Sequence, residues 1–203
     1  LEQFPEPAKD PPRDRPLQFI WVGRLTAHKQ VETALLALHG LGQDGLRYHF
    51  HVVGTGAELP RLRSVAQGLK LTENVTLHGY VSEARKRELL AGADCLLMTS
   101  PREGFSIATL EAMASGCAVL AANPAPPAVP SAVADLVEPG VNGALYTVEP
   151  EALTVAIREM VAVPERLADW QRAARKTAER YDLGKQANKL AEFYERCRQE
   201  RSA

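Results

Sequence analysis

Five short apolar runs alternate along the chain with segments whose apolar residues recur at helical spacing. The apolar runs are Leu17–Val22, Tyr48–Val53, Val75–His78, Cys95–Met98 and Ala118–Ala121. Each run is nearly continuous, which is typical of strands in a parallel sheet that is covered on both faces. The spacing between them predicts helices over Val31–Leu41, Leu59–Leu69, Glu83–Ala91 and Ile107–Ser115. This order predicts an α/β fold with a doubly wound parallel sheet built from right-handed β-α-β units.

The pattern is less regular after residue 121. Short extended segments at Asp135–Val137 and Ala144–Tyr146 are expected to add an edge strand. Three further helices are predicted over Glu151–Val161, Glu165–Tyr181 and Lys185–Glu200. We therefore expect one domain over residues 17–181 and a separate amphipathic C-terminal helix within residues 182–203.

Proline is concentrated in two places. Five of the 14 prolines fall in residues 1–16, and four more fall in residues 124–130. The first cluster predicts a stiff, extended segment, and we interpret residues 1–16 as the remnant of an interdomain linker. The second cluster predicts a loop, because proline at this density permits neither a helix nor a central strand.

Composition and charge narrow the classes of function. The 203 residues include 24 Lys and Arg against 25 Asp and Glu, so no overall positive field attracts nucleic acid. No apolar run approaches the roughly 20 residues of a membrane-spanning helix. Cys95 and Cys117 lie inside apolar segments far from Cys197, which predicts free thiols and a reducing, cytoplasmic location. Without a CxxC or HxxxH pair, we expect no metal site.

Ligands of a doubly wound sheet bind at the carboxyl ends of its strands, so the strand-to-helix loops hold the candidate chemistry. The loop after the first run carries Arg24 and Lys29, two cations where an anion would sit, although solvated loop charges are the plainer interpretation. Gly54 and Gly56, after the second run, would permit close backbone approach to a ligand or a tight turn. The third glycine of a dinucleotide fingerprint would fall at Leu59, so an NAD-binding domain is the weakest candidate.

The loop after the fourth run gives the sharpest signal. Glu103 precedes a helix start marked by Gly104 and Ser106, and Glu111 lies inside that helix. Free amides at the helix start would attract a phosphate, while the two carboxylates would accept hydrogen bonds from hydroxyl groups. The plainer alternative is that Glu103 only favours the helix start and Glu111 faces solvent. Because Glu111 adjoins the apolar side of the helix, we expect it to have a partner.

Six segments between about Phe19 and Tyr146 together resemble the retaining glycosyltransferases of group 1 (family 4), which have the GT-B architecture. In order they are VGRL…K, VGTG, LHGYV, ADCLLMTSPREGFS, LEAMASG and VNGALY, and the two glutamates match the E-x7-E motif as Glu103-GFSIATL-Glu111. The resemblance covers only the Rossmann-like C-terminal, donor-binding half of that architecture, and implies an acceptor-binding N-terminal domain that this chain lacks. It implies transfer of a hexose from a UDP- or GDP-type nucleotide sugar, with retention of configuration and no cofactor or metal, in polysaccharide, glycolipid or glycoconjugate biosynthesis.

The resemblance also implies roles for individual residues. Arg24 and Lys29 would bind the donor diphosphate, Glu103 would contact the donor sugar, and these three would form the catalytic set. Glu111 would hold the ribose hydroxyls. The other donor-binding positions implied by the motifs are Gly23, Gly54, Gly56, Tyr80, Val81, Gly104, Phe105 and Ser106, with Tyr80 and Val81 beside the base.

The sequence departs from the family pattern at three places. Gln30 and Ser106 stand where glycine is usual, and Pro124–Ser131 lacks a glycine pair and an acid. These differences leave two alternatives open: an epimerase or hydrolase of the same architecture, and a non-catalytic nucleotide-sugar-binding module. By itself the chain is expected to bind donor and to turn it over poorly or not at all.

Some residues outside the motifs carry weaker expectations. Trp21 is expected in the core, and Trp170, among charged residues, as an interface anchor. His49 and His51 are expected to pack locally, while His78 could approach the donor. The basic run at 172–180 favours a solvated helix face, although it leaves peripheral contact with the inner face of a membrane open.

Overall fold

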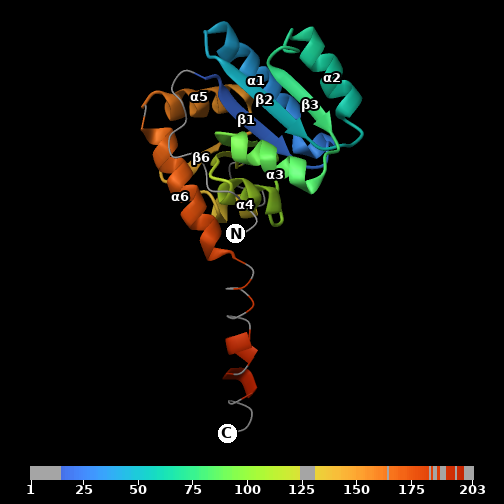
Figure 1. Ribbon diagram of the computed structural model, residues 1–203. Helices are drawn as coiled ribbons and strands as arrows, with labels where there is room; N and C mark the ends of the chain where they lie inside the picture. Colours follow the sequence, from blue (N-terminus) through green and yellow to red (C-terminus); the bar gives the residue numbers. More distant parts are fainter. Residues whose placement is uncertain are drawn as a thin grey trace.

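Six parallel strands form a single sheet in the order β3-β2-β1-β4-β5-β6 (Figure 1). The computed structural model describes residues 15–123, 131–163 and 165–182, together with residues 184, 187, 191–194 and 196–198. The strands are β1 (Leu17–Val22), β2 (Tyr48–Val53), β3 (Val75–Gly79), β4 (Cys95–Met98), β5 (Ala118–Ala122) and β6 (Gly143–Tyr146). The parallel pairing confirms the predicted doubly wound sheet, and the five apolar runs form five of its six strands, β1 to β5, almost to the residue.

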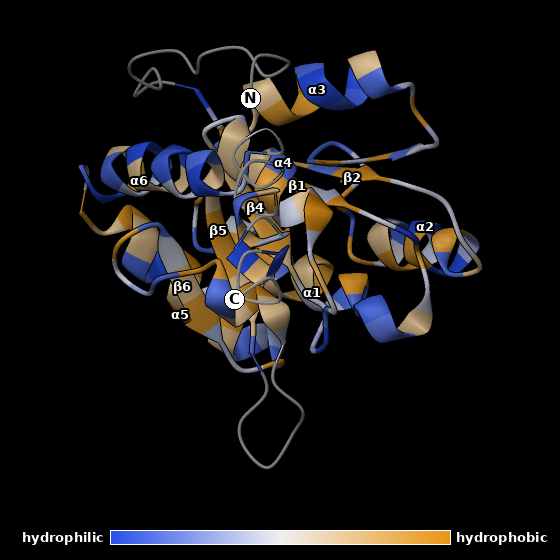
Figure 2. Cartoon of the chain, turned by 90° about the horizontal axis from the view of Figure 1, so that it is seen from below, coloured by the Kyte–Doolittle hydropathy of each residue, from blue (hydrophilic) through white to orange (hydrophobic). Residues whose placement is uncertain are grey.

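Helices cover both faces of the sheet. One face packs against α1 (Val31–Gln43), α2 (Leu59–Gly68) and α5 (Pro150–Val161), and the other against α3 (Glu83–Gly92) and α4 (Ile107–Ala114). The helix α6 (Arg166–Arg180) contacts α4, α5 and β5 beside the far edge of the sheet. Figure 2 shows the consequence in hydropathy: the central strands are apolar, and the outer side of α6 is hydrophilic.

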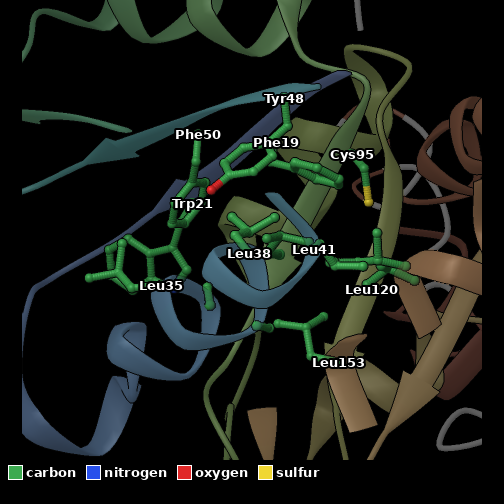
Figure 3. Close-up of a cluster of buried hydrophobic side chains, with 14 of the residues drawn as sticks. Phe19, Trp21, Leu35, Leu38, Leu41, Tyr48, Phe50, Cys95, Leu120 and Leu153 are labelled. Atoms are coloured by element: carbon green, nitrogen blue, oxygen red, sulfur yellow. The ribbon is translucent and has the colours of Figure 1, made fainter. Parts of the chain in front are cut away.

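The larger apolar core lies between the sheet and α1. Phe19, Trp21 and Phe50 project from β1 and β2 onto Leu35 and Leu38 of α1, and all five are at most 1% exposed (Figure 3). Burying each such side chain stabilises the fold by about 1.5–3 kcal/mol. The core therefore fixes β1 at the centre of the sheet, where it presents its carboxyl end to the loops described below.

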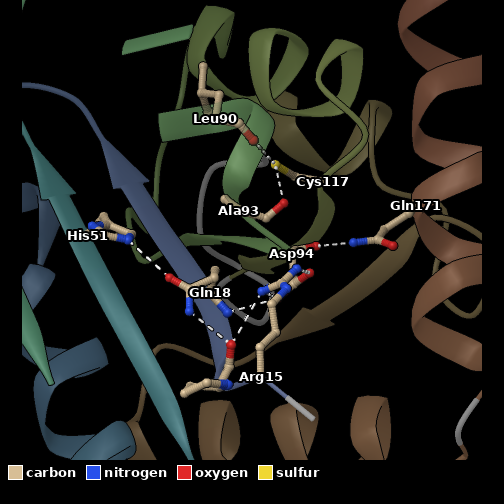
Figure 4. A network of polar contacts seen from close by, with 9 residues as sticks. Arg15, Gln18, His51, Leu90, Ala93, Asp94, Cys117 and Gln171 are labelled. Carbon is tan, nitrogen blue, oxygen red and sulfur yellow. Dashed lines mark hydrogen bonds and ion pairs between the residues drawn. The ribbon is translucent and has the colours of Figure 1, made fainter. Parts of the chain in front are cut away.

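A buried carboxylate joins several elements at the opposite end of the sheet (Figure 4). Asp94 is 2% exposed and accepts two hydrogen bonds from the Arg15 guanidinium, at 2.8 and 2.5 Å, and one from the backbone N–H of Gln18 at 2.8 Å. The Gln171 amide of α6 donates to the Asp94 carbonyl at 3.0 Å. The charge of Asp94 is thus paired and fully hydrogen-bonded, as a buried charge requires.

Two predictions about the region after β5 and α5 are wrong. Residues Asp135–Val137 form no strand: a 3-10 helix, η2 (Ala132–Asp135), occupies part of this segment, and the Val137 N–H closes a turn onto Val133. The edge strand is instead β6, as the second extended segment predicted. Trp170 is no exposed anchor; it is 5% exposed, because α6 turns the stripe of Trp170, Ala174 and Ala178 inward despite its charged neighbours.

Parts of the predicted organisation fall outside the described residues. These are residues 1–14 of the predicted linker, residues 124–130 of the proline-rich loop and much of the predicted C-terminal helix, of which residues 191–194 and 196–198 are helical. The domain boundaries at residues 16 and 181 therefore stay predictions. Within the described ranges, no helix combines the length and the apolar character needed to cross a bilayer.

Candidate functional site

The candidate site lies between β1 and β4, where the order of successive strands across the sheet changes direction. The neighbouring strands β1 and β4 lead into helices on opposite faces, α1 and α4, so the loops after them diverge from a common edge. The Thr99 hydroxyl, directly after β4, donates to the Lys29 carbonyl at 2.6 Å and accepts from the Trp21 indole N–H at 3.2 Å. This contact holds together the two loops that the sequence analysis singled out.

Lys29 and Glu103 form an ion pair across these loops. The distance from Nζ of Lys29 to Oε1 of Glu103 is 2.6 Å, and the side chains are 18% and 13% exposed. Glu103 is fixed by its backbone, since its N–H donates to the Ser131 hydroxyl at 3.0 Å and its carbonyl accepts from Ala132 at 2.9 Å. The fold therefore brings together two of the three predicted catalytic residues, 74 positions apart in the sequence.

The turn that delivers Lys29 has an unusual backbone. Lys29 ends a short 3-10 helix, η1 (Ala27–Lys29), and Gln30 adopts left-handed dihedrals, φ 48° and ψ 41°, before α1 begins. Glycine adopts this conformation more readily than any other residue. Gln30 thus occupies the left-handed backbone position that the resemblance associates with glycine, and it does so with its side chain exposed.

Arg24, the third predicted catalytic residue, lies at the same edge with an exposed side chain. The neighbouring Leu25 is completely buried, so its side chain anchors the loop that carries Arg24. Within residues 15–123, 131–163 and the described part of the C-terminal region, the Arg24 guanidinium makes no ion pair or hydrogen bond. Among the described residues, the carboxyl end of β1 therefore has beside it one cation in an ion pair, Lys29, and one without, Arg24.

The start of α4 follows immediately after Glu103. Ser106 caps the helix: its Oγ accepts from the Thr109 N–H at 3.4 Å and lies 2.7 Å from the Thr109 hydroxyl. Gly104 is exposed, and the large apolar side chains of Phe105 and Ile107 are 60% and 62% exposed. The predicted helix start is confirmed; Ser106 as a whole is only 3% exposed, and its hydroxyl is engaged in the cap.

Glu111 has the partner that the sequence analysis expected, supplied by a residue that it did not identify. The Lys86 ammonium, from the first turn of α3, contacts Oε1 of Glu111 at 2.9 Å and also Oε2 of Glu83 at 2.9 Å. Burial lowers the pKa of Lys86, but the hydrogen bonds to Glu111 and Glu83 outweigh this and raise it overall. Glu83 and Lys86 are three residues apart, so the sequence could have predicted their contact with each other, but not the contact of Lys86 with Glu111.

The glycines after β2 are explained by packing between loops. A Cβ atom on Gly54 would lie 1.8 Å from the Gly23 carbonyl oxygen, and one on Gly56 would lie 2.0 Å from the Leu25 carbonyl oxygen. The Leu25 N–H also donates to the Thr55 carbonyl at 2.8 Å. These glycines therefore shape the loop that carries Arg24, whichever ligand binds there.

The predicted base-contacting residues precede α3. Tyr80 is 84% exposed and Val81 is half-buried, and Ser82 caps the helix by accepting from the Arg85 N–H at 3.2 Å. Glu83 and Lys86 follow this cap on the first turn of α3, and Lys86 reaches α4 through its contact with Glu111.

Three histidines share one face of β2 and β3. Nδ1 of His51 lies 3.0 Å from Nε2 of His78, and Nε2 of His49 lies 2.8 Å from the Thr76 hydroxyl. Burial, with His49, His78 and Arg85 nearby, lowers the pKa of His51 to about 4. His49 and His51 pack locally as predicted, and His78 belongs with them. In the described part of the chain, no group of three or more His, Cys, Asp or Glu side chains could hold a metal ion.

Comparison with known proteins identifies a family that this chain matches. The model of the family described as "Glycosyl transferases group 1" matches residues 3–177. The chain is 30% identical over 139 residues to lipopolysaccharide 1,6-galactosyltransferase of Salmonella typhimurium, covering 68% of this chain and 37% of that protein. It is 32% identical over 173 residues to a GDP-mannose-dependent alpha-(1-6)-phosphatidylinositol dimannoside mannosyltransferase of Mycobacterium tuberculosis, covering 78% and 42%.

Solved structures share the fold. A sucrose-phosphate synthase from Thermosynechococcus elongatus superposes with a TM-score of 0.81 at 23% identity, over 97% of this chain and 50% of that one. Anabaena Alr3699/HepE, solved in complex with UDP, gives a TM-score of 0.77 at 25% identity, over 89% and 49%. The chain thus spans about half the length of these structures and less than half of the curated relatives.

Proposed function

Because this chain belongs to the group 1 glycosyl transferases and has the Rossmann-like fold of the C-terminal half of a GT-B enzyme, we propose that it binds the donor in a retaining sugar transfer. The donor is a nucleoside-diphosphate sugar of the UDP or GDP type. Solved relatives in complex with UDP and a curated relative named as GDP-mannose-dependent support these two types. The N-terminal domain of such an enzyme would supply the acceptor.

The contact between Lys29 and Glu103 at the reversal of the sheet carries the proposal. One N–H of Lys29 is engaged by Glu103 at 2.6 Å, which leaves its other N–H groups and the Arg24 fork for phosphate oxygens. As the bond from the sugar to the diphosphate breaks, negative charge develops on the phosphate, and fixed cations at that point stabilise it. Glu103 faces the same point and would accept hydrogen bonds from the sugar hydroxyls.

The remaining donor contacts follow from the neighbouring elements. Backbone groups of Gly23, Gly104, Phe105 and Ser106 would face the diphosphate and the sugar, with the N-terminus of α4 adding a favourable dipole. Glu111 would accept hydrogen bonds from the ribose, and Tyr80 and Val81 would contact the base. The proposed transfer retains the anomeric configuration of the donor sugar. Arg24 and Lys29, rather than a metal ion, would stabilise the leaving group.

Nucleotide titration tests the donor site. Glu111→Gln is expected to weaken binding of UDP or GDP by about tenfold to a hundredfold, the effect of losing a hydrogen bond to a charged group. Glu151→Gln is the matched control, since Glu151 is exposed on the first turn of α5, on the opposite face of the sheet. Isothermal titration calorimetry measures both variants. Equal affinity of Glu111→Gln and the unaltered chain would remove Glu111 from the site.

The reaction itself is tested on the protein that includes an acceptor domain. Some relatives are named for lipopolysaccharide, colanic acid and phosphatidylinositol dimannoside, so polysaccharide and glycolipid acceptors are the classes to offer. The proposed place of the transfer is the cytoplasmic face of the membrane. Product analysis by NMR is expected to show the anomeric configuration of the donor, and the rate in EDTA is expected to be unchanged. Release of free sugar, with no acceptor product under any of these conditions, would favour the hydrolase alternative.

A further inference from the structure

Lys86 occupies a position that its sequence neighbours do not share. Its ammonium lies between Glu83 of its own helix and Glu111 of α4, 2.9 Å from a carboxylate oxygen of each, and its side chain is 15% exposed. The adjacent Arg85 instead pairs with Glu88 on the outer surface of α3, where the two side chains are 53% and 65% exposed. Lys86 is thus a sheltered cation between two helices that both begin at the carboxyl edge of the sheet.

The pair of Lys86 and Glu111 still has hydrogen-bonding capacity. An ammonium group has three N–H donors, and Glu83 and Glu111 engage two of those of Lys86. Only Oε1 of Glu111 is engaged, and no hydrogen bond to its Oε2 is found among the described residues. One donor and one acceptor are therefore left side by side. A ribose presents two neighbouring hydroxyl groups, each of which can both donate and accept, and this chemistry matches the pair.

We propose that Lys86 is a second ribose-binding residue, which donates to one ribose hydroxyl while Glu111 accepts from the other. This assignment rests on the proposed function, which places the ribose at Glu111. It makes Lys86 a specificity-determining residue: the site selects ribonucleotides, because a deoxyribose would leave either the third N–H of the ammonium or Oε2 of the carboxylate without a hydrogen bond. The charge of the lysine is maintained because its pKa is raised.

A purely structural role makes a different prediction. If the ion pair only fastened α3 to α4, its loss would disturb the whole nucleotide site. Affinity for ribonucleotides and deoxyribonucleotides would then fall in parallel. The ratio of the two affinities separates the roles, whereas the affinity for one nucleotide does not.

The experiment first titrates the unaltered chain with UDP and with GDP, and continues with the tighter of the two. The 2′-deoxy and 3′-deoxy forms of that nucleotide are then titrated into the unaltered chain and into Lys86→Met. The unaltered chain is expected to prefer the ribonucleotide at least about tenfold over one of the deoxy forms, as a site built around a hydroxyl does. Lys86→Met should bind the ribonucleotide about tenfold more weakly and bind that deoxy form almost as before, so that the ratio falls toward one.

Matched variants complete the test. Arg85→Met removes a cation from the same helix and should keep the ratio of the unaltered chain, and Lys86→Arg should keep most of it. Thermal unfolding shows whether each variant is folded. If Lys86→Met does not fold, Lys86→Gln replaces it. A ratio in the folded Lys86 variant equal to that of the unaltered chain would overturn the assignment. Failure of the unaltered chain to bind either nucleotide would instead overturn the proposed function itself, and the assignment with it.

Discussion

At the scale of single residues, Gly54 must be glycine because the backbone of a neighbouring loop lies against it, whether or not a ligand binds. Its φ of 142° is rarely adopted by other residues, and a Cβ atom there would meet the Gly23 carbonyl at 1.8 Å. We expect Gly54→Ala to lower the free energy of unfolding by about 3 kcal/mol or more, because the obstacle is backbone that cannot rotate away.

Urea denaturation tests this prediction, with Gly40→Ala as its control. Gly40 lies inside α1, and a Cβ atom there would meet nothing within 4 Å. This change should raise the free energy of unfolding by about 0.5–1 kcal/mol, through the lower backbone entropy of alanine in the unfolded chain. Similar midpoints for Gly54→Ala and the unaltered chain would mean that the loops after β1 and β2 are not in close contact.

For Glu111, the sequence predicted that a partner exists but did not identify it as Lys86. The apolar neighbours of Glu111 in the sequence implied that its carboxylate has a partner, and this is confirmed. The identity of the partner depends on how α3 packs against α4, 25 residues away in the sequence. Local spacing carries no information about that packing.

At the scale of elements, the histidine face of β2 and β3 predicts a dependence of stability on pH. Burial and neighbouring positive charge lower the pKa of His51 to about 4 in the folded protein, from about 6.5 in an unfolded chain. Between these values the unfolded chain binds a proton that the folded protein does not bind. The free energy of unfolding should therefore be constant above about pH 6.5 and fall as the pH decreases from 6.5 toward 4. The pKa values of His49 and His78 are also lowered, so they act in the same direction.

Urea denaturation at a series of pH values from 7.5 to about 5 measures this dependence before most carboxylates titrate. His51→Gln should flatten the curve, because the glutamine amide can still reach Gln18 and carries no titrating proton. His39, whose side chain contacts Gln43 on α1, provides the control, and His39→Gln should leave the slope unchanged. An equal slope in His51→Gln would assign the dependence to other groups.

Prediction of elements succeeded where the sequence pattern was unambiguous. Each of the five apolar runs became a strand, because a sheet buried on both faces requires continuous apolar residues. The segment Asp135–Val137 was wrong because three residues contain too little pattern to distinguish an extended segment from a 3-10 turn. The prediction for Trp170 was wrong because the buried stripe of α6 has only about one residue per turn, and such a stripe is hard to recognise among charged neighbours.

At the scale of the whole molecule, the cysteines report whether the fold is intact. Cys95 and Cys117 are completely buried in β4 and just before β5, and burial raises the pKa of both thiols. Cys197, in the C-terminal region, is partly exposed. Since the thiolate is the reactive form, a disulfide reagent at pH 8 should modify Cys197 promptly and the other two only as the domain unfolds.

Absorbance of the released thiol chromophore counts the reacting cysteines over time, with and without urea. The variant Cys197→Ser should show no prompt reaction, and its slow reaction, that of Cys95 and Cys117, should be unchanged. Rapid modification of all three thiols in the native protein would mean that the two cysteines of the sheet are accessible.

The sequence alone determined the parallel sheet and the group 1 family that the comparisons then showed, and it predicted that the candidate loops meet at the carboxyl edge of the sheet. These are local or repeated properties: apolar runs are set by burial, and motifs keep their order and spacing along the chain. Only the tertiary structure decided that Lys29 contacts Glu103 and that Lys86 contacts Glu111. Such pairs form between side chains brought together by the packing of distant elements, and their identity is fixed by the way the helices lie on the sheet.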